Sequence, residues 1–160
     1  MTRGGWLRAL GAALVAAVGL MPAAAAGAAP ASSSKTICVG LVIDDRSIGG
    51  SVSAKCVTVK RGTTGVGVLQ AAGHVLTFRS DGVMCTIDGV PKSGCHDVDD
   101  SHYWAYFQRA PDGTAWSYSS EGPAAYEPAN RATEGWVYDD GRSLKPDNVP
   151  AAKICAALLK

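Results

Sequence analysis

The sequence predicts a small α+β domain, a mostly antiparallel sheet with one short helix that is stapled by disulfides. Three observations predict this class. Segments of alternating apolar residues, typical of strands, recur between Gly-rich turns. The segment 65–72 instead has helical spacing. Five cysteines in a chain of 160 residues with an export-like start indicate a disulfide framework.

Composition excludes several classes of protein. The hydrophobic fraction of 47% is enough for one domain to bury a core. The 15 Lys and Arg residues nearly balance the 14 Asp and Glu residues. Because a nucleic-acid-binding protein needs a clustered basic face, we expect no nucleic-acid partner. The length also argues against a large enzyme.

Residues 1–31 have the pattern of a secretory signal peptide. Arg3 and Arg8 form a positive start, 9–20 is uncharged and apolar, and small residues suited to cleavage follow. A retained membrane helix is the alternative, but the apolar stretch is short, rich in Ala and without a basic flank. We expect a secreted, extracellular protein with no membrane attachment after cleavage, opening on a polar leader at 32–36.

Two alternating segments, 37–43 and 52–60, predict an antiparallel hairpin. If the hairpin is centred on Ser47, Cys38 and Cys56 are directly opposed, because both are equally distant from that centre. Directly opposed residues come within disulfide reach. We therefore expect a Cys38–Cys56 bond, with coincidence of spacing as the alternative.

The helix is expected at 65–72. Val66, Leu69 and Ala72 recur at intervals of three, Thr63 or Thr64 is suited to the N-cap, and Gly73 to a left-handed stop. Two glycines weaken the segment intrinsically, so packing on a sheet must stabilise it.

Two further strands are expected at 75–79 and 83–87, around a Ser-Asp-Gly turn. Cys85 and Cys95 are expected to staple the loop that follows. Cys155 is then the odd thiol: free, paired with another chain, or displacing an assigned partner by tying the tail to the first hairpin.

A Trp-x-Tyr motif occurs three times, at 104–106, 116–118 and 136–138. Strand side chains alternate, so each pair projects from one face, and three such strands side by side form an aromatic wall. Asp112-Gly113 is the expected turn between the first two. The wall is either hydrophobic core or a platform for a planar ligand or protein partner. The candidate ligand-binding residues are Trp104, Tyr106, Trp116, Tyr118, Trp136 and Tyr138.

Several segments together resemble a known family. They are Gly62 to His74 (GTTGVGVLQAAGH), Val83 to Pro91 (VMCTIDGVP), Tyr103 to Phe107 (YWAYF), Trp116 to Ser119 (WSYS) and Glu134 to Trp136 (EGW). The chain resembles the transcobalamin C-terminal-like domain of small secreted actinobacterial proteins over residues 37–140, leaving 141–160 as a tail. The resemblance implies a β-grasp-like curved sheet crossed by one helix. In transcobalamins this domain closes over cobalamin together with a larger helical domain.

Catalytic and metal chemistry find less support. The loop 96–102 holds three carboxylates and two imidazoles, but it lacks the Gly of an EF-hand loop and fits neither Cys₂His₂ spacing nor H-E-x-x-H, so we expect a solvated loop and no metal. Cys155 with a histidine lacks any local nucleophile signature, and no G-x-S-x-G or P-loop occurs. We expect no enzyme and no required cofactor. The expected function is binding a small planar ligand of cobalamin or corrinoid type. The alternative is an extracellular protein-interaction or inhibitor module that presents the Cys85–Cys95 loop.

Overall fold

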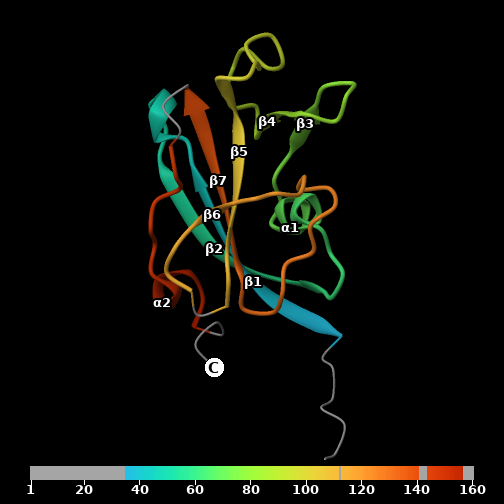
Figure 1. The fold of residues 1–160 in the computed structure, drawn as a ribbon, viewed down its shortest axis with the longest axis vertical. Coiled ribbons are helices and arrows are strands. Elements are labelled where there is room, and N and C mark those ends of the chain that lie inside the picture. Colours follow the sequence, from blue (N-terminus) through green and yellow to red (C-terminus); the bar gives the residue numbers. More distant parts are fainter. Residues whose placement is uncertain (1–34, 112, 141–143, 157–160) are drawn as a thin grey trace, which may run out of the picture. The chain divides into compact units, whose positions relative to one another are not determined.

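The computed structural model describes residues 35–111, 113–140 and 144–156. The expected signal peptide at 1–31 lies outside these residues, as does Asp112 of the expected Asp112-Gly113 turn. A five-stranded sheet has the order β2-β1-β7-β5-β6, and a separate two-stranded sheet is formed by β3 and β4 (Figure 1). The strands are β1 (Thr36–Asp44), β2 (Val52–Lys60), β3 (Leu76–Phe78), β4 (Met84–Ile87), β5 (His102–Arg109), β6 (Ser117–Tyr118) and β7 (Thr133–Asp140).

The large sheet is mostly antiparallel, as expected. β1 and β2 form the predicted hairpin, and β5 is antiparallel to both β6 and β7. One pair departs from this pattern, because β7 returns beside β1 in the parallel sense. The sequence patterns predict strands but not this pairing, which joins segments nearly a hundred residues apart. The fold is α+β; a β-grasp-like sheet stays a prediction.

Helix α1 (Gly65–Ala71) begins where the sequence predicts and ends one residue before the predicted end, with Ala72 as its C-cap. The Thr64 hydroxyl accepts a hydrogen bond from the Gly67 amide at 3.3 Å, and Gly73 adopts a φ of 92° just after the helix. Gly65 is required by a close approach. A β-carbon there would lie 2.6 Å from the Tyr106 hydroxyl oxygen, so the helix start packs directly against β5.

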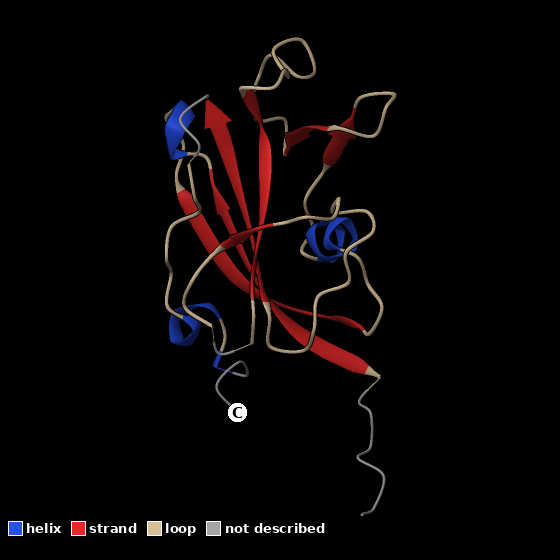
Figure 2. Cartoon of the chain, in the orientation of Figure 1, coloured by secondary structure: helices blue, strands red, loops and turns tan. Residues whose placement is uncertain are grey.

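The two faces of the sheet are covered differently. Figure 2 shows α1 and the β3–β4 hairpin on one side and helix α2 (Ala151–Ile154) on the other. Alternation in β1 explains how both faces are filled. Val39 and Leu41 pack in the core cluster that contains Val68 and Leu69 of α1, and Val42 points to the opposite face. The tail thus supplies a second short helix, which packs against β1 and β2. The 3₁₀ turn η1 (Arg46–Ile48) connects β1 to β2 and contacts β7.

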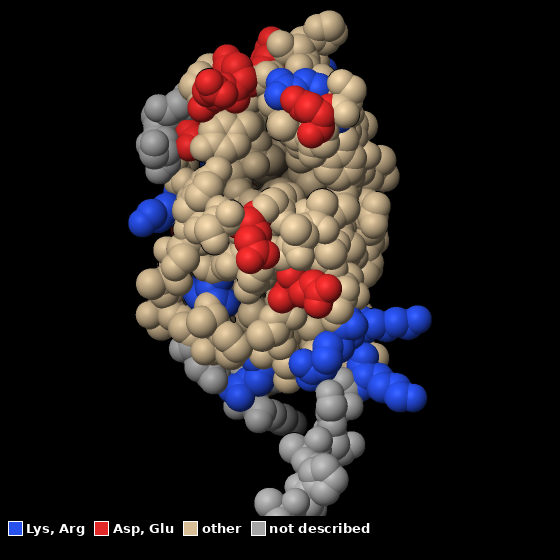
Figure 3. Space-filling view, turned by 45° about the vertical axis from the view of Figure 1, so that its right-hand side comes forward, with Lys and Arg blue, Asp and Glu red and all other residues tan. Residues whose placement is uncertain are grey.

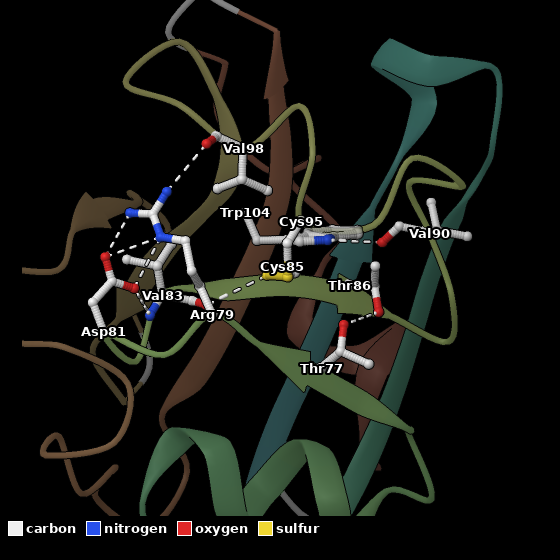
Figure 4. The surroundings of a disulfide bond; sticks show 10 residues. All are labelled: Thr77, Arg79, Asp81, Val83, Cys85, Thr86, Val90, Cys95, Val98 and Trp104. Atoms are coloured by element: carbon white, nitrogen blue, oxygen red, sulfur yellow. Dashed lines mark hydrogen bonds and ion pairs between the residues drawn. A yellow bond between two sulfur atoms is a disulfide. The ribbon is translucent and has the colours of Figure 1, made fainter.

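The Cys85–Cys95 disulfide forms as expected. It ties the loop after β4 to Cys85, which is fully buried (Figure 4). The indole Nε1 of Trp104 adds a second anchor by donating a hydrogen bond to the Val90 carbonyl at 3.0 Å. The loop is therefore held both covalently and by the core.

The expected Cys38–Cys56 bond is wrong. Cys56 is bonded to Cys155, and Cys38 is the free cysteine among the described residues. The reason is the hairpin register: Gly40 pairs with Cys56, and Cys38 pairs with Thr58, so the centre of the hairpin is Ile48 instead of Ser47. Cys38 and Cys56 are consequently diagonal neighbours on one face, and Cys155 reaches that face from the tail.

Candidate functional site

Four of the six predicted wall residues share one face of the sheet. Trp104 pairs with Tyr138, and Tyr106 pairs with Trp136, in the antiparallel register of β5 and β7. Directly opposed residues lie on the same face of a sheet. The rings of Tyr106 and Trp136 are 4.6 Å apart, and those of Trp104 and Tyr138 meet edge to face at 5.6 Å.

The third motif does not extend this wall. In β6, Tyr118 pairs with Phe107, so the register matches even-numbered residues of β6 with odd-numbered residues of β5. The Tyr118 ring meets Phe107 edge to face at 5.3 Å. Trp116 packs in the cluster of Phe107, on the face opposite to the wall, with the guanidinium of Arg109 4.6 Å from its ring centre. The expected alignment of all three motifs on one face is therefore wrong, because Trp116 and Tyr118 do not lie on the face that carries Tyr106.

A cavity of about 380 Å³ nevertheless brings Tyr118 together with part of the wall. We call it the aromatic cavity. It lies between the β3–β4 turn, the wall and the loop after β6, and it is lined by Asp81, Gly82, Val83, Met84, Trp104, Tyr106, Tyr118, Ser119, Ser120, Glu121, Gly122, Pro123 and Trp136. The space-filling view shows the hollowed surface on this side of the protein, with mostly uncharged side chains around it (Figure 3).

Burial decides how this cavity can be used. Trp104, Tyr106 and Trp136 are only 1 to 6% exposed, so they form its floor and are at the same time part of the core. Tyr118 is 60% exposed and stands at its mouth. Of the two alternatives, hydrophobic core describes the wall residues of β5 and β7, and Tyr118 is exposed as a platform residue would be. The structure has an aromatic-floored cavity with hydroxyl and carboxylate groups at its rim.

The loop after β6 is fixed by hydrogen bonds. Gln108 Nε2 donates to the Ser119 hydroxyl at 2.5 Å, and that hydroxyl donates to the Glu121 carbonyl at 2.6 Å. The carbonyl of Pro123 accepts from the Val66 amide at 3.0 Å, at the first turn of α1. The loop therefore doubles as the cap of this helix, so the rim of the cavity is ordered by the fold.

A buried carboxylate lies behind the floor of the aromatic cavity. The Tyr106 hydroxyl donates a hydrogen bond to Glu134 Oε1, and Glu134 is fully buried. Its Oε2 has no hydrogen-bond partner among the residues the structure describes. Burial raises the pKa of Glu134 to about 7, against the opposing hydrogen bond from Tyr106.

A second cavity, of about 370 Å³, adjoins the first and shares Val83 and Tyr118 with it. Between them lies the ion pair of Arg79 and Asp81, whose atoms approach to 2.7 Å. Arg79 also donates to the Val98 carbonyl at 3.2 Å (Figure 4). A hydrogen bond with Tyr118 raises the pKa of Tyr103 to about 12, so Tyr103 presents a neutral hydroxyl to the second cavity at physiological pH.

The central carboxylate of the acidic loop at 96–102 accepts hydrogen bonds from other groups of the same loop. Asp99 Oδ1 accepts from the Ser101 amide, the Ser101 hydroxyl and the His102 amide, at 2.7 to 2.8 Å. The bonds from Ser101, reinforced by those from His102, lower the pKa of Asp99 to about 2.

A different group has the spacing of metal ligands: within the described ranges, Cys38, Cys56 and Cys155 alone place three ligand atoms within 4.8 Å of one another.

Sequence reasoning missed Glu134 and the two loops that complete the cavity. The signal for Glu134 was present, because alternation along β7 places it on the same face as Trp136 and Tyr138. The loops carry no such signal. They are brought to the wall by the β3–β4 and β5–β6 connections, which local patterns do not place in space.

Three comparisons with known proteins complete the description. A family model described as the SCO2322-like domain matches residues 39–100, from β1 to the loop before β5. No curated protein matches. The crystal structure of haptocorrin in complex with Cbi is similar to this chain at a TM-score of 0.44 and 20% sequence identity, over 65% of this chain and 25% of that chain. This chain thus corresponds to about a quarter of the length of that protein.

Two findings bear on the cellular environment. Two disulfides form among the described residues, which is typical of proteins from oxidising compartments. No helix in the described part of the chain is long and apolar enough to cross a membrane.

Proposed function

We propose that this protein is a secreted, non-catalytic binding domain, and that its ligand is a small planar molecule of corrinoid type held at the aromatic cavity. The observation that carries the proposal is the cavity itself. Apolar and aromatic walls with a few polar groups at the rim are typical of small-molecule sites, which span about 300–1,000 Å³. The cavity of about 380 Å³ falls at the lower end of that range.

The size of the cavity defines how a corrinoid would bind. A corrin macrocycle is broad and flat and exceeds the cavity, so one edge of the ring would enter while the remainder stays outside. Tyr118, at the mouth, would contact the ring face, and the exposed hydroxyl of Ser120 would meet polar groups at its periphery. The choice of a corrinoid as the first ligand to test comes from the resemblance of residues 37–140 to the transcobalamin C-terminal-like domain.

The test is equilibrium binding of cobinamide to the purified protein by titration calorimetry. We expect saturable binding, and we expect Tyr118→Ala to weaken it by about 5- to 30-fold, because an aromatic contact at an interface contributes about 1–2 kcal/mol. Tyr118 is the informative position because it is exposed, so its truncation leaves the core intact.

Phe78→Ala is the matched control. Phe78 is also an exposed aromatic, at 41%, but it lies outside the aromatic cavity. Equal affinity of Tyr118→Ala and the wild-type protein would show that a corrinoid binds elsewhere. Absence of binding by folded, disulfide-intact protein would contradict the corrinoid proposal.

That last outcome would favour the second candidate, a protein-interaction module. The observation behind it is the rigid Cys85–Cys95 loop, which carries the exposed side chain of Lys92 and is anchored by the buried Cys85 and Trp104. A loop ordered before binding loses little conformational entropy on association.

A further inference from the structure

Three cysteines from distant parts of the chain meet on the face of the sheet opposite to α1. Cys38 lies on β1, Cys56 on β2, and Cys155 directly after α2. Cys56 and Cys155 form a disulfide. The Cys38 Sγ lies 2.6 Å from the Cys56 Sγ and 3.3 Å from the Cys155 Sγ.

Three sulfur atoms therefore lie in contact, and a disulfide uses only two of them. Both distances from Cys38 are well inside van der Waals contact, so the free sulfur packs directly on the bond. The β1–β2 register explains it, because Cys38 and Cys56 are diagonal neighbours on the same face of the hairpin. The two sulfurs are therefore held together by the sheet, independently of Cys155.

We propose that Cys38, Cys56 and Cys155 form an internal thiol–disulfide exchange site, in which the bond moves between Cys56–Cys155 and Cys38–Cys56. The thiolate of Cys38 attacks the Cys56 Sγ, a Cys38–Cys56 bond forms, and the Cys56–Cys155 bond breaks. Cys155 leaves as a thiolate and takes up the proton that Cys38 lost. The step exchanges one thiol and one disulfide for another such pair, so it requires neither an oxidant nor a reductant.

The geometry sets one requirement on this step. Exchange proceeds along the line of the bond that breaks. Cys38 Sγ contacts both sulfurs, so it lies beside the bond and must swing into line by a side-chain rotation. Cys38 is half-buried, and solvent can take its proton; Cys155 is buried against Ile154 and Val42.

The exchange would control how the tail is held. In the bonded state, the Cys56–Cys155 disulfide ties the tail to β2 across 99 residues of sequence. After exchange, non-covalent contacts alone hold it. These are the packing of Ile154 against Val42 and the hydrogen bonds from the Arg109 guanidinium to Asn148 Oδ1 at 2.9 Å and to the Val149 carbonyl at 3.1 Å.

The test is to map the free thiol of the purified protein. Protein incubated at pH 8.5 without added thiol or oxidant is quenched with acid, alkylated with N-ethylmaleimide and digested without reduction for mass spectrometry. We expect the label on both Cys38 and Cys155, with Cys155 labelled in up to about one molecule in ten, the upper end of an ordinary minor-state population. Peptides joined through Cys38–Cys56 should appear in the same proportion.

Two variants and one internal reference give the result its meaning. Cys38→Ser should contain the Cys56–Cys155 bond alone and no labelled thiol, and Cys155→Ser should form Cys38–Cys56. The Cys85–Cys95 bond should stay intact throughout. Label confined to Cys38 in the wild-type protein would overturn the proposal, as would label on Cys155 accompanied by scrambling of Cys85 and Cys95.

Discussion

Replacing Glu134 by Gln is expected to stabilise the protein above neutral pH and to leave it unchanged in acid. Burial raises the pKa of the Glu134 carboxyl from 4.5 to about 7. Between these two values the folded state keeps a proton that the unfolded state has released, so the free energy of unfolding falls as pH rises. The loss reaches about 3 kcal/mol once pH exceeds 7, since each pKa unit corresponds to about 1.4 kcal/mol.

Gln is a suitable replacement because its carbonyl oxygen can accept the hydrogen bond from Tyr106, as the carboxyl does. Urea denaturation should show that the free energy of unfolding of the wild-type protein falls between pH 4.5 and pH 8. The Glu134→Gln variant should lack the part of this fall that comes from Glu134. The exposed Glu127→Gln serves as the control and should follow the wild-type curve. Parallel curves for wild type and Glu134→Gln would mean that Glu134 is ionised in the folded protein.

Truncation of the cavity floor is expected to have the largest effect on stability. Trp136 is 1% exposed, its ring lies 4.6 Å from that of Tyr106, and it pairs with Ile43 across the parallel β1–β7 contact. Removing a buried aromatic side chain forfeits its burial and leaves a void, so Trp136→Ala should lower the free energy of unfolding by about 3–5 kcal/mol. Urea denaturation at pH 5, where Glu134 is protonated, isolates this packing effect.

Tyr118→Ala provides the comparison on the same cavity. Tyr118 is mostly exposed; its ring contacts Phe107 and its hydroxyl shares a hydrogen bond with Tyr103. Its truncation should cost less than about 1 kcal/mol. Similar losses for Trp136→Ala and Tyr118→Ala would contradict the division of the cavity into a core floor and an exposed mouth.

The elements were predictable because their signals are local. Alternation marks β1 and β2, and Thr64 and Gly73 delimit α1 through a cap and a left-handed turn that involve only adjacent residues. Gly82, with a φ of 87°, marks the β3–β4 turn in the same way.

The candidate site was predictable only in part, because it depends on register. A shift of one residue in β6 moves Tyr118 to the other face, and the hairpin centre at Ile48 places Cys38 diagonal to its expected partner Cys56 instead of directly opposite. Neither shift changes the composition or the alternation of the strands. The position of Cys155 depends on how residues 144–156 fold back, which no periodic pattern records.

The most direct test of a ligand at the aromatic cavity is the response of the tryptophan side chains to cobinamide. The indole N–H groups give separate signals in ¹H–¹⁵N spectra, and the fold provides an internal reference: Trp104 and Trp136 line the aromatic cavity, and Trp116 packs on the opposite face. We predict that saturating cobinamide shifts the signals of Trp104 and Trp136 and leaves that of Trp116 in place. Unchanged signals for Trp104 and Trp136, or a shift confined to Trp116, would contradict binding at this cavity.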